Sequence, residues 1–488
     1  MKYFSILALL IIVFLMSACE KEVSVSPPDE PPPDGSVFID SYPASFMIYM
    51  NGKYRIRNTP DSIKWLETGS YEILLRRDLF LDTVFTVDVV EGERTNIFID
   101  ISKNPRMLGN LSVVSEPEGA EIIINDSSTS IYTPYIFKKM LPGIYKVSLK
   151  YENHEDINFS INVKSNFTAS YNAVMIDTTV WDYFNMGNSG LPAKVLTCLA
   201  IDDNDVKWIG SREGAVSFDG IAWNLQSPSN SELTHQIVTS IAVDSKNAKW
   251  ITTIGGIGIA SDMEVDSKWA KIDNGLSTDY YNKVFIKKAE RDIYYFGTDL
   301  GLVIFAFDAD PFTMSYTWRD VGNPLSSSIT SIWNGTNGYL VGSSESGVAV
   351  SRDTWVVYNR LNSNIPGNTI SAMYESNEGI WVGHLPGSGT SGGLSLYNNG
   401  RFDVFTLYIP GPVINTIFVD SRNIKWIGTD FGLFAFKTIS NKVLINESNT
   451  GLPIKDVTGI SEDSNGNIWF STRDNGLYKL KKINKFVQ

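Results

Sequence analysis

One pattern of apolar and polar positions recurs through the larger, C-terminal part of the chain. Val413–Phe436 shows it in full: an apolar run, a polar turn, a run centred on Trp-Ile-Gly, a glycine turn and a last apolar run. Alternation with β-branched and aromatic enrichment indicates strands, and Asp, Ser, Asn and Gly between them indicate turns. We expect three short strands in this stretch.

The same three-strand unit occurs seven times, and its spacing predicts the architecture. A propeller blade of four strands takes about 40–50 residues. The centres of the second strands are 41 to 45 residues apart, at Trp208, Trp250, Tyr295, Leu340, Trp381, Trp426 and Trp469. One blade per repeat fits this spacing.

A fourth strand is expected between successive units, often starting at an aromatic residue. These strands begin at Trp181, Trp223, Trp269, Trp318, Trp355, Phe402 and Val443. The first precedes the first unit, whereas the last unit, Val457–Leu480, has no fourth strand after it. We therefore expect the Trp181 strand to complete the last sheet and close a seven-bladed β-propeller over residues 178–488, since closure removes open sheet edges.

These repeats resemble the two-component-regulator propeller repeat. The resemblance lies in INTIFVDSRNIKWIGTDFGLFAF (Ile414–Phe436) and VTGISEDSNGNIWFSTRDNGLYKL (Val457–Leu480). Family members often form the extracytoplasmic sensor of a membrane histidine kinase, so the resemblance implies a sensor or binding role. A fold alone does not define a ligand.

Two copies of a smaller unit precede the repeats, offset by 74 residues. The second copy contains SEPEGAEIIIN (Ser115–Asn125) and LPGIYKVSL (Leu141–Leu149), and its Ser, Pro, Asn, Thr-Pro, Gly and Tyr positions match the first copy. This unit resembles the PEGA domain, a small antiparallel β-sandwich. We expect two PEGA-like sandwiches, at 37–104 and 109–176, that serve as spacers or adhesive modules. The whole fold is predicted to be all-β.

The N-terminus predicts a lipid anchor. Residues 1–18 combine Lys2 with an apolar run too short to span a bilayer, which is typical of a secretory signal. Small residues then precede Cys19, as in bacterial lipoprotein signals, and residues 19–36 form a Pro-rich, acidic linker. An ordinary signal with an incidental cysteine is the alternative. We expect lipidation of Cys19 and attachment to a membrane of the bacterial envelope. The outer membrane is favoured, facing the periplasm or the surface, because Glu20 and not Asp follows Cys19.

Composition excludes one class of partner. The chain has 41 basic and 54 acidic residues and a formal net charge of −13. Nucleic-acid binding needs clustered Lys and Arg, so no nucleic-acid partner is expected. If Cys19 is acylated, Cys198 has no disulfide partner, and we expect it to be a buried thiol in a first strand.

No metal or cofactor is predicted. Asp202, Asp244, Asp420 and Asp463 end the first strands, and the stretch from Asp463 is similar to half of a calcium loop. It lacks the closing Glu, and Asp before Ser, Asn or Gly is typical of tight turns, so we interpret the set as turn residues. The three histidines lie in different elements without metal-ligand spacing.

The candidate ligand site lies in the loops that join second and third strands. In propellers these loops gather on one face around the central channel. Here they are charged and differ from blade to blade, as grafted binding residues or solvated turns would. The candidate ligand-binding residues are Arg212, Glu213, Asp299, Glu345, His384, Asp430, Arg473 and Asp474.

The leading hypothesis is a lipid-anchored extracytoplasmic protein whose propeller face recognises a glycan, a peptide or a protein partner. A structural adhesin or assembly dock without a small ligand is the alternative. A third hypothesis is a propeller lyase or glycosidase. No Gly-x-Ser-x-Gly elbow or Cys/His pair supports an enzyme, so we expect none. A glycan site should present exposed aromatic residues at the channel mouth.

Overall fold

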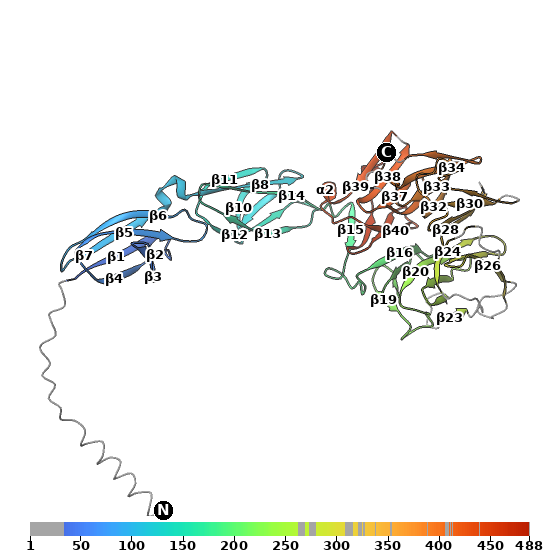
Figure 1. Ribbon diagram of the computed structural model, residues 1–488, viewed down its shortest axis with the longest axis horizontal. Coiled ribbons are helices and arrows are strands. Elements are labelled where there is room, and N and C mark those ends of the chain that lie inside the picture. The colour runs from blue at the N-terminus through green and yellow to red at the C-terminus, as the bar shows by residue number, and fades with distance from the viewer. Residues whose placement is uncertain are drawn as a thin grey trace, which may run out of the picture. The chain divides into compact units, whose positions relative to one another are not determined.

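The computed structural model describes residues 34–261, 269–272, 280–307, 316–320, 325, 327–336, 338–351, 354–387, 389–405, 409, 411, 413–438 and 440–487. The predicted signal, Cys19 and most of the predicted linker lie outside this part of the chain. Two units are distinguished, one of Met1–Leu149 with Asn158–Asn172 and one of Lys150–Ile157 with Ala173–Gln488. Figure 1 shows the two sandwiches in blue to cyan and the ring of sheets in green to red.

The two sandwiches have the same topology. The first has sheets in the order β4-β1-β7 and β3-β2-β5-β6, and the second has β11-β8-β14 and β10-β9-β12-β13. The first contains β1 (Gly35–Tyr42), β2 (Met47–Met50), β3 (Lys53–Asn58), β4 (Asp61–Leu66), β5 (Gly69–Arg76), β6 (Thr83–Val89) and β7 (Arg94–Asp100). The second contains β8 (Gly109–Glu116), β9 (Glu121–Ile124), β10 (Ser127–Tyr132), β11 (Tyr135–Met140), β12 (Gly143–Lys150), β13 (Ile157–Val163) and β14 (Thr168–Val174).

The residues shared by the two copies hold a turn together. Ser41 Oγ lies 2.6 Å from Thr59 Oγ1, and Ser115 Oγ lies 2.5 Å from Thr133 Oγ1. Both Thr hydroxyls also accept a hydrogen bond from a backbone N–H thirteen residues earlier in the chain. These matched residues therefore have the structural role expected of turn chemistry.

The second unit contains seven four-stranded sheets within the described residues. Figure 1 shows them arranged as a ring. Six are formed by four consecutive strands: β16 (Leu196–Ile201), β17 (Lys207–Ser211), β18 (Ala215–Phe218), β19 (Trp223–Gln226); β20 (Val238–Val243), β21 (Lys249–Thr253), β22 (Gly256–Ala260), β23 (Trp269–Ile272); β24 (Tyr281–Lys287), β25 (Ile293–Thr298), β26 (Leu302–Phe307), β27 (Tyr316–Asp320); β28 (Ile329–Gly335), β29 (Gly338–Ser343), β30 (Val348–Ser351), β31 (Trp355–Tyr358); β32 (Ile370–Ser376), β33 (Gly379–His384), β34 (Gly393–Asn398), β35 (Arg401–Val404); β36 (Ile414–Val419), β37 (Lys425–Thr429), β38 (Gly432–Thr438), β39 (Asn441–Ile445).

The remaining sheet closes the ring. It has the order β15-β42-β41-β40, with β15 (Trp181–Phe184), β40 (Val457–Glu462), β41 (Ile468–Thr472) and β42 (Gly476–Leu480). β15 pairs antiparallel with β42, so the predicted pairing of the Trp181 strand with the last unit is confirmed. The first strands contact one another in order, and β16 contacts β40, which makes their contacts a closed circle.

Helical segments are short in the described residues. They are η1 (Ile101–Lys103), η2 (Pro105–Met107), α2 (Glu447–Thr450) and η5 (Ile483–Lys485). Among these residues no helix has the length and apolar character needed to cross a bilayer.

The aspartates at the ends of the first strands are turn residues, as predicted. Asp420 Oδ1 accepts hydrogen bonds from the backbone of Arg422 and Ile424, and its Oδ2 accepts one from Trp426 Nε1 at 3.0 Å. The same Asp-to-Trp bond, six residues apart, forms at Asp202, Asp244 and Asp463. The repeated Trp therefore fixes each turn from inside the core.

Buried lysines link neighbouring sheets. Lys249 Nζ lies 3.5 Å from Asp202 Oδ2, and both side chains are at most 1% exposed. The same ammonium lies 5.2 Å from the ring centroid of Trp208. This contact joins the second strand of one sheet to the Asp–Trp turn of the sheet before it.

Candidate functional site

The first strand of every sheet carries the same backbone irregularity. Its register with the second strand shifts between its first and third residues in all seven sheets. A bulge of this kind turns the extra side chain away from regular alternation. The residues at this second position are all small and polar or amides: Thr197, Thr239, Asn282, Thr330, Ser371, Asn415 and Thr458.

Three of these hydroxyls connect adjacent sheets. Thr197 Oγ1 donates to the Val238 carbonyl at 2.8 Å, and the hydroxyls of Thr239 and Thr330 make the equivalent bonds at 2.5 Å. Ser371 Oγ and Asn415 Nδ2 occupy the same position, are buried and have no hydrogen-bond partner among the described residues. Buried polar atoms normally find partners, so these two atoms have unused hydrogen-bonding capacity.

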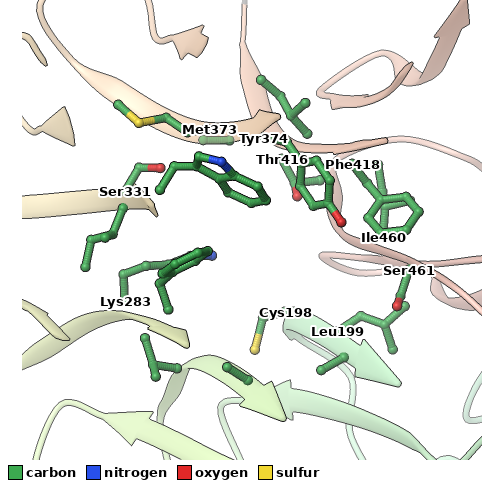
Figure 2. Close-up of a pocket in the computed structure, with 18 of the residues that line it drawn as sticks. Cys198, Leu199, Lys283, Ser331, Met373, Tyr374, Thr416, Phe418, Ile460 and Ser461 are labelled. Carbon is green, nitrogen blue, oxygen red and sulfur yellow. The ribbon is translucent and has the colours of Figure 1, made fainter. Parts of the chain in front are cut away.

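The first strands enclose a cavity of about 540 Å³ in the centre of the ring. All seven sheets contribute to its lining, and Figure 2 shows the labelled residues arranged around an open centre. The described lining residues include two charged ones, Lys283 and Lys288, and no Asp, Glu or His. This cavity is the candidate ligand site.

Four aromatic residues form a continuous arc along the cavity. They occupy the fifth position of four successive first strands: Phe285, Trp333, Tyr374 and Phe418. Neighbouring ring centroids are 5.1, 4.6 and 5.2 Å apart along this arc, within the range of favourable aromatic contacts. All four side chains are half-buried.

The opposite side of the cavity is built from small residues. The fifth position of the other three first strands is Ala200, Ala242 or Ser461, and all three line the cavity. The cavity therefore has one wall of aromatic side chains and an opposite wall of small side chains, which leave space for a ligand. This asymmetry is suited to holding a flat ligand against the aromatic rings.

Polar contacts fix the arc. Trp333 Nε1 donates to Glu375 Oε2 at 3.2 Å. Burial raises the pKa of Tyr374 to about 12, and the charge of Glu462 contributes to this shift. The Tyr374 hydroxyl, which Figure 2 shows directed toward the opening, is therefore protonated at neutral pH and can donate a hydrogen bond.

Lys283 and Cys198 also line the cavity. Burial lowers the pKa of Lys283. Burial raises the pKa of the Cys198 thiol, and the nearby Lys283 opposes it. Cys198 lies in β16 as expected, but it is half-buried and borders the cavity. With its pKa raised, it is a neutral thiol at neutral pH.

None of the eight residues predicted from the sequence lines this cavity. They lie in or beside the loops between second and third strands. Six are exposed: Arg212, Glu213, Asp299, Glu345, Arg473 and Asp474. Backbone hydrogen bonds join some of these loops around the rim, because Asp456 N–H donates to Asp430 O and Arg473 N–H donates to Asp456 O. Asp474 borders a separate hollow of about 250 Å³.

His384 has a different position from the one expected. It is the last residue of β33 and is completely buried, not part of an open loop. Its Nδ1 lies 2.7 Å from the Gly367 carbonyl and its Nε2 lies 2.7 Å from Ser395 Oγ. Burial lowers the pKa of His384 to about 4. Both ring nitrogens contact protein atoms, so neither is open to a ligand.

Asp430 is half-buried on the same rim. Its Oδ1 is buried and has no hydrogen-bond partner in the described part of the chain. Burial raises the pKa of Asp430, and the charge of Asp456 adds to the increase. In the described part of the chain no group of three or more His, Cys, Asp or Glu side chains is placed to hold a metal ion.

The aromatic arc and Lys283 were missed by reading the first strands as uniform apolar runs. A signal was present, because an aromatic residue recurs at the fifth position in four consecutive copies and in no other copy. Aligning the repeats by this position would have revealed the aromatic side of the channel. It would not have shown that Ser371 and Asn415 lack partners.

Comparison with known families decides the identity of the N-terminal modules. The PEGA domain model matches residues 34–105 and 108–177, and the two component regulator propeller model matches residues 451–474. The protein carries two PEGA domains and a two component regulator propeller repeat. No curated protein matches the chain.

Solved structures share the fold of the propeller. The extracellular domain of BT3049 from B. thetaiotaomicron, assigned to a hybrid two component system, is 18% identical with a TM-score of 0.50 over 62% of this chain and 41% of that chain. The extracellular domain of BT4673 from B. thetaiotaomicron, assigned to a one component system, is 20% identical with a TM-score of 0.48 over 62% and 40%. Virginiamycin B lyase from Staphylococcus aureus is 13% identical with a TM-score of 0.47 over 62% and 98%. This chain thus spans about two fifths of the two extracellular domains.

Proposed function

We propose that this protein is an extracytoplasmic binding protein of the sensor type, tethered through lipid at Cys19, and that a glycan binds in the channel of its propeller. The carrying observation is the aromatic arc that faces a wall of small residues across the cavity. The C–H face of a sugar ring packs on aromatic rings, while its hydroxyls need nearby hydrogen-bonding groups. The Tyr374 hydroxyl, which Figure 2 shows directed toward the opening, offers such a group.

The extracytoplasmic assignment is supported by two observations of different kinds. Residues 1–19 have the features of a lipoprotein signal. The similar propellers from B. thetaiotaomicron are extracellular domains. The outer membrane remains the proposed location, because Glu20 follows Cys19.

Binding rather than catalysis fits the composition of the cavity. General acid–base chemistry on a glycan uses a pair of carboxyl groups, and the lining within the described part of the chain contains no Asp or Glu. A lyase or glycosidase would shorten or desaturate the bound oligosaccharide, which chromatography of the incubated ligand detects.

Titration calorimetry of the full chain against a panel of oligosaccharides tests the proposal. Trp333→Ala should weaken binding about 10- to 100-fold, because it removes roughly the burial energy of one aromatic side chain. Trp65→Ala is the matched control, since Trp65 is 75% exposed and belongs to the first PEGA domain. Equal binding by the Trp333 variant and the natural chain would contradict the channel site. A purely structural dock predicts that no variant binds any oligosaccharide.

A further inference from the structure

The charge of the cavity is opposite to that of the protein. The chain has a formal net charge of −13, yet the lining residues that the structure describes include two lysines and no carboxylate. Lys288 has a carboxylate nearby, because its Nζ lies 3.8 Å from Asp203 Oδ1. Lys283 has no carboxylate partner among the described residues. The cavity therefore contains a basic side chain that no described carboxylate pairs with.

Lys283 is placed beside the aromatic arc. It is the third residue of the first strand β24, and Phe285 is the fifth. Residues two apart in a strand share a face and are about 7 Å apart. A ligand stacked on the first rings of the arc would therefore lie within reach of the Lys283 ammonium.

An unpaired ammonium in a half-buried site is costly, and the cost is removed when an anion binds. Desolvation of a charged group is compensated only by a counter-charge or hydrogen bonds. The neighbouring Cys198 does not supply that charge, because burial raises the pKa of its thiol. The Tyr374 hydroxyl, on the fifth sheet of the ring, adds a hydrogen-bond donor to the cavity.

We infer that the channel ligand is acidic, a sugar that bears a carboxylate or a sulfate, and that Lys283 binds its anionic group. This inference rests on the proposed glycan site and specifies its substrate class. Lys283 selects for charge, and the arc holds the ring to which the charged group is attached.

The same arrangement makes binding depend on pH. An anion bound at Lys283 raises the pKa of that ammonium above its value in the free protein. Affinity should then be constant below the pKa of the free protein and decrease as the pH rises toward the pKa of the complex. A neutral ligand held only by the arc would show no such decrease.

Three probes that differ only at C6 of one sugar residue distinguish a neutral from an acidic ligand. They are a neutral glucose disaccharide, the same disaccharide with glucuronate in place of one glucose, and the 6-sulfate ester of the neutral disaccharide. Calorimetry with the full chain should give tighter binding for one or both acidic probes. The preferred acidic probe identifies carboxylate or sulfate as the recognised group. In Lys283→Met that preference should fall about 10- to 100-fold, as expected for the loss of a charge-assisted hydrogen bond. Lys283→Arg should retain most of the preference.

The controls distinguish failure of this inference from failure of the proposed function. Lys246→Met removes an exposed lysine and should leave all three affinities unchanged. Binding of the neutral probe that depends on Trp333, with no acidic preference or with a preference unaffected by Lys283→Met, would overturn the inference and leave the glycan site intact. Failure of all three probes and of the wider panel would overturn both. Thermal unfolding of Lys283→Met confirms that the variant is folded.

Discussion

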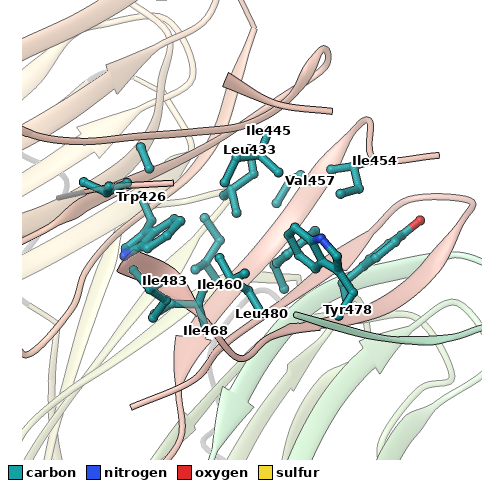
Figure 3. Packing of buried hydrophobic residues seen from close by; sticks show 14 of the residues in the cluster. Trp426, Leu433, Ile445, Ile454, Val457, Ile460, Ile468, Tyr478, Leu480 and Ile483 are labelled. Carbon is teal, nitrogen blue, oxygen red and sulfur yellow. The ribbon is translucent and has the colours of Figure 1, made fainter. Parts of the chain in front are cut away.

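Trp181 lies directly opposite Leu480 in the antiparallel pair of β15 and β42. Nearly the whole propeller separates the two along the chain, and their pairing completes the last sheet of the ring. Trp181 is 4% exposed, and its ring centroid lies 6.2 Å from that of Phe470 and 5.6 Å from that of Phe486. Figure 3 shows the core around this closure, with Tyr478, Leu480 and Ile460 in the same cluster.

Removal of the Trp181 side chain from the closing strand should destabilise the ring. We expect Trp181→Ala to lower the free energy of unfolding by about 3–5 kcal/mol, because it leaves a cavity in a packed core. Urea titration followed by tryptophan fluorescence and circular dichroism measures the change. Trp65→Ala, at an exposed site, should change stability by less than about 0.5 kcal/mol. Similar values for the two variants would contradict a closure that depends on Trp181.

Breaking a buried ion pair between sheets should cost more than removing both charges. Lys249→Met leaves Asp202 buried without its cation, and we expect a loss of about 3–5 kcal/mol. The double variant Lys249→Met, Asp202→Asn should recover part of that loss, because the introduced amide carries no charge while its oxygen can still accept from Trp208 Nε1. Additive losses in a double-mutant cycle by urea unfolding would show that the two groups do not interact.

Acid should destabilise the ring through His384. Its pKa is lowered to about 4 in the folded protein, below the ordinary value of about 6.5. The unfolded chain therefore binds the proton more readily, and stability is lost as the pH falls from about 6.5 toward 4, by at most about 1.4 kcal/mol per pH unit. His384→Gln should flatten this part of the profile in urea titrations. His154→Gln, outside the ring of sheets, is the control, and an unchanged slope in His384→Gln would exclude this source.

Two exposed apolar residues of the first PEGA domain are held in a left-handed backbone conformation. Ile56 has φ 57° and is 84% exposed, and Trp65 has φ 63°. We expect Ile56→Asn to raise the free energy of unfolding by about 0.5–1 kcal/mol, because Asn tolerates this conformation and little apolar burial is lost. The second domain carries Ser130 at the matching position, with φ 53°. Ile63→Asn, at a site that is 8% exposed, should instead destabilise the domain strongly. Thermal unfolding of the variants measures both effects.

Lipidation of Cys19 is tested directly in cells. Metabolic labelling with an alkyne-tagged fatty acid should mark the natural chain and fail to mark Cys19→Ser. The variant should also leave the membrane fraction, because two or more acyl chains are needed for stable anchoring. Cys198→Ser should keep both the label and the membrane association. Labelling of Cys19→Ser would contradict the proposed anchor.

The repeat architecture follows from the amino-acid sequence. Each periodic Trp, Asp or Gly position indicates a local feature, either a strand buried on both faces or a tight turn. The strands of a single copy, such as Val413–Phe436, can therefore be predicted without the other copies. The closure by Trp181 could also be predicted, because the repeat region begins with one unpaired strand and its last unit has only three strands. Pairing the first strand with the last unit leaves no open sheet edge.

The position of the candidate site depends on the assembled fold. The loop residues nominated from the sequence are charged and variable, but charge and variability do not reveal which side chains share a cavity. His384 shows the difference, since its position after Trp-Val-Gly looks like a loop, yet both ring nitrogens contact buried protein atoms. Lys283 and Tyr374 meet one space because a closed ring brings the first strand of every sheet to its axis. Those strands are far apart in the chain, and convergence at an axis is a property of the assembled ring that no local pattern contains.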